Sequence, residues 1–188
     1  MLQIFSRHPR LSLANFTGLL KLITMDVIID GYNLIASEQG LRGALEHKRN
    51  GLVRQLARYQ KAKGFFVSVV FDGWKAGALT EISEKVDGVT VIYSRQGEKA
   101  DSVVMRVARQ KGSGCVVVSS DREVRSGVEK FGATAIYADE FNQILRRLDE
   151  PGWDDEDNDS ELSRFRTGNR LAKTERRRQE KLKKLRLD

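Results

Sequence analysis

The sequence predicts an α/β protein built around a parallel sheet with helices on both sides. Short runs rich in Val, Ile and Phe recur along the chain, and segments with helical periodicity lie between them. Apolar runs without alternation are typical of strands buried on both faces. Strands alternating with helices indicate right-handed βαβ units. We therefore expect about five parallel strands, at residues 26–29, 65–71, 89–93, 116–119 and 134–137.

The expected helices follow from apolar residues that recur with a period near 3.6. The first covers residues 41–63, where Leu52, Leu56 and Tyr59 share a face and Gly64 ends the helix. The others are expected at residues 101–110, 122–131 and 140–148. Each helix lies between two predicted strands or after the last one, as a βαβ arrangement requires.

Charge divides the chain into segments. The net charge is +7, yet residues 25–150 carry 19 basic and 17 acidic side chains and are nearly neutral. Residues 162–188 carry 11 basic and 3 acidic side chains. Such a run is typical of a phosphate-binding surface, and a solvated or disordered segment is the alternative. We therefore expect a core domain at 25–150, an acidic linker at 151–161 and a basic helical tail at 162–188 that binds RNA through Arg176, Arg177, Arg178 and Lys181.

The first 24 residues contain no Asp or Glu and only a mild apolar stretch. We interpret residues 1–24 as a dispensable extension, with Met25 as a start point beside the first strand; organelle targeting is the alternative. Cys115 is the single cysteine and has no partner for a disulfide, which suits a reducing compartment. No segment is long and apolar enough for a membrane span, so a soluble, cytoplasmic protein is expected.

Four aspartates lie near the ends of predicted strands or at the start of a helix. Asp30, Asp72 and Asp121 follow the strands predicted at 26–29, 65–71 and 116–119. Asp101 begins the helix after the strand predicted at 89–93. In open parallel sheets, ligands bind beyond the carboxyl ends of the strands. Carboxylates gathered there repel one another, so they indicate a site for a divalent cation, and oxygen ligands favour Mg²⁺ or Mn²⁺. Asp is also a common turn and cap residue, which is the structural alternative.

These positions carry a resemblance to a known family. At residues 30–33, 70–73, 97–101 and 119–124 the chain resembles the YacP-like branch of the NYN domain family, which is PIN-like and related to metal-dependent ribonucleases. Four motifs in the right order cover the whole expected core. The resemblance implies a three-layer α/β/α domain, an acidic metal site and endonucleolytic cleavage of RNA.

Carried over by position, the resemblance implies catalytic roles for Asp30, Asp72, Asp101 and Asp121. The metal ligands would be Asp30, Asp101 and Asp121, while Asn33, Ser119 and Ser120 match further site positions. The resemblance makes messenger RNA or ribosome-associated RNA the expected substrate class, with RNA and the ribosome as partners. We therefore expect a Mg²⁺- or Mn²⁺-dependent endoribonuclease in which a metal-activated water attacks the phosphodiester.

Lys99 departs from the family pattern, since a small residue or Thr is expected there. A lysine so close to Asp101 favours an alternative function, an RNA-binding module that keeps the fold but cleaves poorly. A phosphotransferase of the haloacid dehalogenase type needs a second Asp two positions after the first, where this chain has Tyr32. A dinucleotide-binding domain is excluded because no Gly-rich loop follows the first strand.

Overall fold

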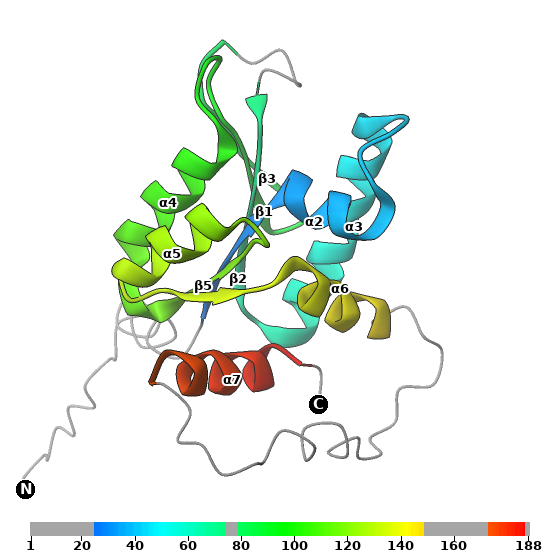
Figure 1. Cartoon of the computed structure of the whole chain (residues 1–188). Coiled ribbons are helices and arrows are strands. Elements are labelled where there is room, and N and C mark those ends of the chain that lie inside the picture. Colours follow the sequence, from blue (N-terminus) through cyan, green and yellow to red (C-terminus); the bar gives the residue numbers. More distant parts are fainter. Residues whose placement is uncertain (1–24, 74–78, 149–172, 187–188) are drawn as a thin grey trace, which may run out of the picture.

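The computed structural model describes residues 25–73, 79–148 and 173–186 of the 188-residue chain (Figure 1). The expectations for residues 1–24 and for the linker at 151–161 therefore lie outside the described residues. So does the first part of the expected basic tail, up to residue 172.

A six-stranded sheet forms the centre of the molecule, in the order β3-β4-β2-β1-β5-β6. All neighbouring strands are parallel except β3 and β4, which are antiparallel. The five predicted strands are confirmed to within one residue, and β3 is an additional strand that the pattern did not predict. The strands are β1 (Asp26–Asp30), β2 (Phe66–Phe71), β3 (Ile82–Val86), β4 (Val89–Tyr93), β5 (Cys115–Val118) and β6 (Thr134–Ile136).

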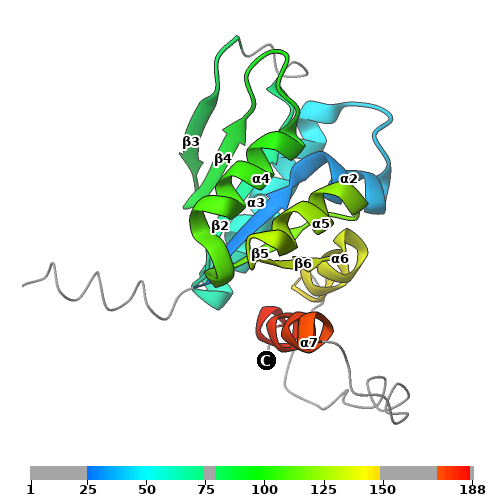
Figure 2. The same cartoon turned by 60° about the vertical axis from the view of Figure 1, so that its left-hand side comes forward.

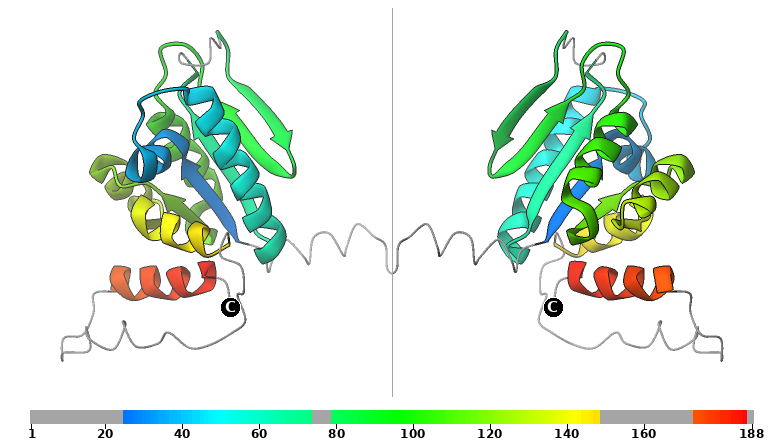
Figure 3. Two further views of the ribbon diagram at one scale, coloured as in Figure 1. Left: turned by 90° about the vertical axis from the view of Figure 1, so that its right-hand side faces the viewer. Right: turned by 90° about the vertical axis from the view of Figure 1, so that its left-hand side faces the viewer.

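Helices cover both faces of this sheet and confirm the three-layer architecture. One layer contains α2 (Gly31–Gln39), α3 (Leu45–Lys63) and α6 (Ala138–Arg147), and the other contains α4 (Ala100–Lys111) and α5 (Arg122–Lys130). Figure 3 shows the first layer in front in its left view and the second in front in its right view. A hydrophobic core lies on each face of the sheet, and β1 contributes side chains to both. Val27 and Ile29 face the first layer of helices, and Ile28 faces the second.

The predicted helices are confirmed to within two residues, with two differences. Helix α3 begins at Leu45, because the chain around Gly40 and Gly43 has positive φ angles of 65° and 92° that do not continue a helix. Helix α2 was not predicted at all. It begins directly after β1, where the side chain of Asp30 caps it by accepting a hydrogen bond from the backbone N–H of Asn33.

The strand order places the carboxyl ends of β1, β2 and β5 side by side. Strand β1 pairs with β2 on one side and with β5 on the other. The chain moves outward from β1 through β2 and β4, and then returns to the other side of β1 to form β5 and β6. The switch point of an open α/β sheet lies where the order reverses, and ligands bind there. The fold thus places its crevice at β1 and its two neighbours.

The basic C-terminal segment is partly folded onto the core. Helix α7 (Lys173–Leu185) buries Leu185 completely and packs Leu182 against the first core. The hydroxyl of Tyr59 donates a hydrogen bond to the carbonyl of Leu185 at 2.9 Å. Residues 173–185 therefore form a docked helix, which differs from the expected separate tail. Figures 1 and 2 show α7 at the end of the molecule opposite the loop that joins β4 to α4.

None of the helices formed by the described residues has the length and apolar character needed to cross a membrane.

Candidate functional site at the carboxyl edge of the sheet

The four predicted aspartates lie around the carboxyl ends of neighbouring strands. Asp30 is the last residue of β1, Asp72 follows β2, and Asp121 caps α5 just after β5. Asp101 lies in the first turn of α4. A cavity of about 370 Å³ is lined by Asp30, Asp72 and Asp101 together with residues 97–100. This cavity therefore brings together carboxylates from positions up to 71 residues apart in the sequence, while Asp121 lies outside its lining.

Asp30 is the most buried of these acids, with 6% of its surface exposed. One carboxylate oxygen accepts the backbone N–H of Asn33 at 3.2 Å, and the other accepts the hydroxyl of Ser119 at 3.3 Å. Loss of water contact raises the pKa of Asp30 from 3.8 to about 6, against the opposing effect of the Asn33 hydrogen bond. Repulsion from Asp101 and Asp72 adds to the rise.

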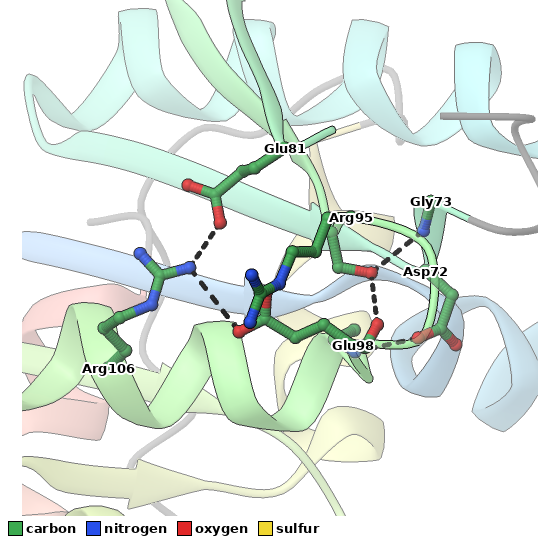
Figure 4. A network of polar contacts seen from close by, with 8 residues as sticks. Asp72, Gly73, Glu81, Arg95, Glu98 and Arg106 are labelled. Carbon is green, nitrogen blue, oxygen red and sulfur yellow. Dashed lines mark hydrogen bonds and ion pairs between the residues drawn. The ribbon is translucent and has the colours of Figure 1, made fainter. Parts of the chain in front are cut away.

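Asp72 organises the loop that leads into α4. Its carboxylate accepts the backbone N–H of Ala100 at 2.8 Å, which fixes the start of the helix that carries Asp101 (Figure 4). Asp101 is half-buried, and its pKa is raised first by loss of water contact and then by the charges of Asp121 and Asp72. The exposed Lys99 acts in the opposite direction and lowers the pKa of Asp101. This lysine therefore offsets part of the repulsion among the acids.

Asp121 and its two preceding serines connect the site to α5 and α6. A single oxygen of Asp121 accepts the backbone N–H groups of Glu123 and Val124 at 2.7 and 3.0 Å. The hydroxyl of Ser119 accepts the N–H of Asp121 at 3.2 Å while it donates to Asp30. Ser119 therefore bridges two of the candidate metal ligands.

Asn33 and Ser120 hold neighbouring loops together. The side-chain oxygen of Asn33 accepts the backbone N–H of Ser120 at 2.8 Å. The hydroxyl of Ser120 accepts the N–H of Ala138 at the start of α6 at 3.1 Å. Both side chains fix the geometry around the acids through the backbone, and Ser120 also remains exposed.

Ser94 is a site residue that the sequence pattern did not single out. It is fully buried after β4, accepts the N–H of Gly73 at 3.0 Å and donates to the carbonyl of Glu98 at 2.7 Å (Figure 4). It therefore ties the end of β2 to the loop before α4. The carboxylate of Glu98 pairs with Arg95 at 3.3 Å and Arg106 at 3.8 Å. Ser94 could have been found in the sequence from its position, because its hydroxyl directly follows the strand predicted at 89–93.

The basic residues expected to bind RNA lie elsewhere. Arg176, Arg177, Arg178 and Lys181 belong to α7, and none of them lines the cavity formed by the aspartates. Arg178 is ion-paired with Glu140 and, at 2.9 Å, with Glu175, and its guanidinium lies over the ring of Tyr137. Only 16% of its side chain is exposed. Arg178 therefore helps to dock the helix on the core, and its contact with RNA stays a prediction.

The donor set of the acidic edge fits a hard divalent cation. Mg²⁺ is usually bound by one or two carboxylates together with water and phosphate, so it needs no closed cage of protein ligands. In the described part of the chain, no three His, Cys, Asp or Glu side chains are grouped closely enough to hold a metal ion by themselves. Cys115 is buried on β5, where its thiol contacts the carbonyl of Gly112. The carboxylates at this edge therefore suit Mg²⁺ or Mn²⁺ better than a thiolate-bound metal.

Burial of Asp30 predicts a pH-dependent stability. Because its folded pKa of about 6 lies above its ordinary value of 3.8, the folded protein binds this proton more tightly than the unfolded chain. The free energy of unfolding should therefore fall as pH rises from about 4 to about 6, by roughly 3 kcal/mol from this group. Urea unfolding of the wild type and Asp30→Asn, in chelator at several pH values, measures the effect. A stability difference between the two proteins that does not change with pH would contradict it.

The chain matches a family model and a protein of known sequence. A model of the YacP-like NYN domain matches residues 27–186, which include α7. The uncharacterized protein YacP of Bacillus subtilis (strain 168) is 32% identical over 90 residues, covering 45% of this chain and 52% of that protein. The aligned stretch thus spans about half the length of that relative.

Two solved structures share the fold. The crystal structure of Rae1 (YacP) from Bacillus subtilis has a TM-score of 0.55 and 25% identity, covering 65% of this chain and 74% of that one. A point mutant of the same protein has a TM-score of 0.56 and 23% identity, covering 67% and 77%.

Proposed function

The chain belongs to the YacP-like NYN domain family, and from this premise we propose that it is a metal-dependent endoribonuclease. One observation carries the proposal: Asp30, Asp72, Asp101 and Asp121 converge at the carboxyl edge of the sheet. There, burial and mutual repulsion raise the pKa values of Asp30 and Asp101. Such a cluster is costly in an isolated protein and is stabilised by a bound cation. Acids with raised pKa values in a cleft are also typical of functional sites.

The proposed metal ligands are Asp30, Asp101 and Asp121, with Mg²⁺ or Mn²⁺ as the cation. When bound, the cation would lower the pKa of a coordinated water and neutralise charge on the phosphodiester. Ser119 orients Asp30 and the backbone of Asp121 through its two hydrogen bonds. Asp72 positions Asp101 by holding the first N–H of α4. These hydrogen bonds hold Asp30, the backbone of Asp121 and the start of the helix that carries Asp101, and a bound cation would draw the three carboxylates together.

The proposed substrate is RNA, in the form of messenger RNA or ribosome-associated RNA, and family membership supports this choice. A second candidate is an RNA-binding module that cleaves poorly. The position of Lys99 favours it, because its positive charge lowers the pKa of Asp101 and so partly replaces a cation at this edge. Both functions predict RNA binding, but only the endoribonuclease predicts cleavage products.

Incubation of the full chain with end-labelled structured and single-stranded RNAs tests the proposal. Cleavage in Mn²⁺ or Mg²⁺ that stops in chelator, with products carrying a 5′-phosphate, is expected for water attack at a metal site. RNA that is bound but stays intact in either metal would instead support the binding module. The Lys99→Thr variant, which removes the nearby charge, should then be tested for a gain of cleavage.

A further inference from the structure

A second cleft lies between α7 and the core, away from the acidic edge. It has a volume of about 260 Å³ and is lined by Arg177, Lys181 and Lys184 of α7. The core contributes Ser113, in the turn before β5, and Thr134, the first residue of β6. These core residues lie at the amino ends of their strands, whereas the aspartates lie at the carboxyl ends. A five-residue strand such as β1 separates the two ends by roughly 16 Å.

Positive charge in this cleft exceeds negative charge. Arg177, Lys181 and Lys184 follow one another at spacings of four and three, so they share one face of α7. Among residues 25–73, 79–148 and 173–186, no carboxylate forms an ion pair with any of the three. Glu180 also lines the cleft, but its carboxylate lies 3.9 Å from Arg176. Three cations and one acid leave the cleft with a positive excess.

Lys181 is the cation of this cleft whose charge is least well compensated by its surroundings. It is half-buried, and its ammonium group lies 3.6 Å from the sulfur of Met25, a weak acceptor. Loss of water contact lowers the pKa of Lys181, and the charge of Lys184 lowers it further. A bound anion would relieve both effects, because it would supply the missing counter-charge and hydrogen-bond acceptors. Arg178, one turn before Lys181, has no such need because Glu140 and Glu175 neutralise it.

We propose that the cleft between α7 and the amino ends of β5 and β6 binds a phosphate group of the RNA backbone. Arg177, Lys181 and Lys184 supply the charge, and the hydroxyls of Ser113 and Thr134 can donate hydrogen bonds to phosphate oxygens. The identity of the ligand as RNA rests on the proposed function, while the anion chemistry does not. An RNA that reaches this cleft and the acidic edge together is held at two opposite ends of the sheet.

The same helix provides a matched control. Arg177→Gln with Lys184→Gln removes two charges from the cleft, while Lys173→Gln with Lys183→Gln removes two from exposed positions of α7 that do not line it. Lys181 is left in place because it also contacts Met25. All proteins carry Asp30→Asn and are measured in chelator, so that RNA affinity is read whether or not the protein cleaves RNA. Equal thermal unfolding of both variants shows that α7 stays docked.

Affinity for a long single-stranded RNA is then measured against salt concentration. We expect the cleft variant to bind about tenfold more weakly and to lose roughly 0.7 from the slope of log affinity against log salt, as the loss of one phosphate contact predicts. The control variant should lose less than half as much of either quantity. Equal losses in both variants would show a diffuse charge effect and overturn the site, as would an unchanged cleft variant.

Inorganic phosphate separates a free anion from an RNA phosphate. Millimolar phosphate at constant ionic strength should compete with RNA for the wild-type cleft and have no such effect on the cleft variant. Phosphate binding that is lost in the cleft variant while RNA affinity stays unchanged would assign the cleft to a free anion and overturn the RNA assignment. A failure of cleavage in the earlier experiment would leave this measurement intact, since it requires binding alone.

Discussion

Asp30→Asn should reduce RNA cleavage by at least about 1,000-fold while RNA remains bound. The substitution keeps the size of the side chain and its oxygen at Asn33, but it removes the most buried carboxylate of the acidic edge. A lost ligand charge weakens the proposed cation and the stabilisation it gives to the transition state. Single-turnover cleavage at saturating enzyme, with Mn²⁺ titrated over several decades, measures the loss and its dependence on metal.

Asp26→Asn is the matched control because it changes the other end of the same strand. Asp26 pairs with Lys111 at 2.8 Å, in an exposed ion pair at the amino end of β1. Exposed pairs contribute little stability, so this variant should cleave RNA like the wild type. Cleavage by Asp30→Asn at the rate of Asp26→Asn would remove the acidic edge from the proposed mechanism. Removing a buried charge is expected to stabilise the fold at neutral pH, and the urea unfolding of Asp30→Asn separates a loss of cleavage from a loss of folded protein.

The positions of the acids could be predicted because they depend on strands with a strong sequence signal. The runs before Asp30 and Asp72 are buried on both faces of the sheet, so their composition alone marks them as strands. Parallel pairing then brings their carboxyl ends to one edge. The sequence could not predict that Ser119 connects Asp30 with Asp121, because the hydrogen bond from Ser119 to Asp30 joins residues 89 positions apart.

Strand β3 escaped prediction because all five of its residues are exposed. It is an edge strand that pairs with β4 alone. Because none of its side chains is buried, its sequence shows no alternation of apolar and polar residues that would predict a strand. A local signal was nevertheless present in Asp87-Gly88, whose φ angles of 50° and 92° are typical of a tight hairpin turn. The turn residues, and not the strand itself, carried the information.

Helix α7 shows how charge can hide a docking face. Its sequence is dominated by Lys and Arg, which suggests a solvated or RNA-bound helix. Leu182 and Leu185, three residues apart, form a narrow apolar stripe that packs on the core. The partner of Arg178, Glu140, lies 38 residues earlier in the sequence. The local sequence therefore could not show which basic residues of α7 pair with the core and which stay exposed to solvent.

Gly31→Ala should destabilise the fold by about 2 to 3 kcal/mol and also weaken cleavage. Gly31 is buried directly after Asp30, and a β-carbon added there would lie 2.6 Å from Cδ1 and 2.9 Å from Cζ of Phe71. That ring is fully buried and is held by Tyr32 and Tyr93, with ring centroids 5.3 and 5.8 Å away. A tightly packed ring cannot move aside without cost, and overpacked cores typically lose about 1 to 3 kcal/mol.

The expected loss is measured as a lower urea midpoint at unchanged slope, and two further variants isolate its cause. Gly51→Ala places the same methyl group in α3 where nothing lies within 4 Å, so it should stabilise the protein by about 0.5 to 1 kcal/mol. Adding Phe71→Leu to Gly31→Ala removes the ring edge that meets the new methyl group, so the double variant should be less destabilised than the sum of the two single variants. Strict additivity would show that Gly31 is required for a reason other than its contact with Phe71. Because the displaced backbone carries Asp30, restored stability should be accompanied by partly restored cleavage.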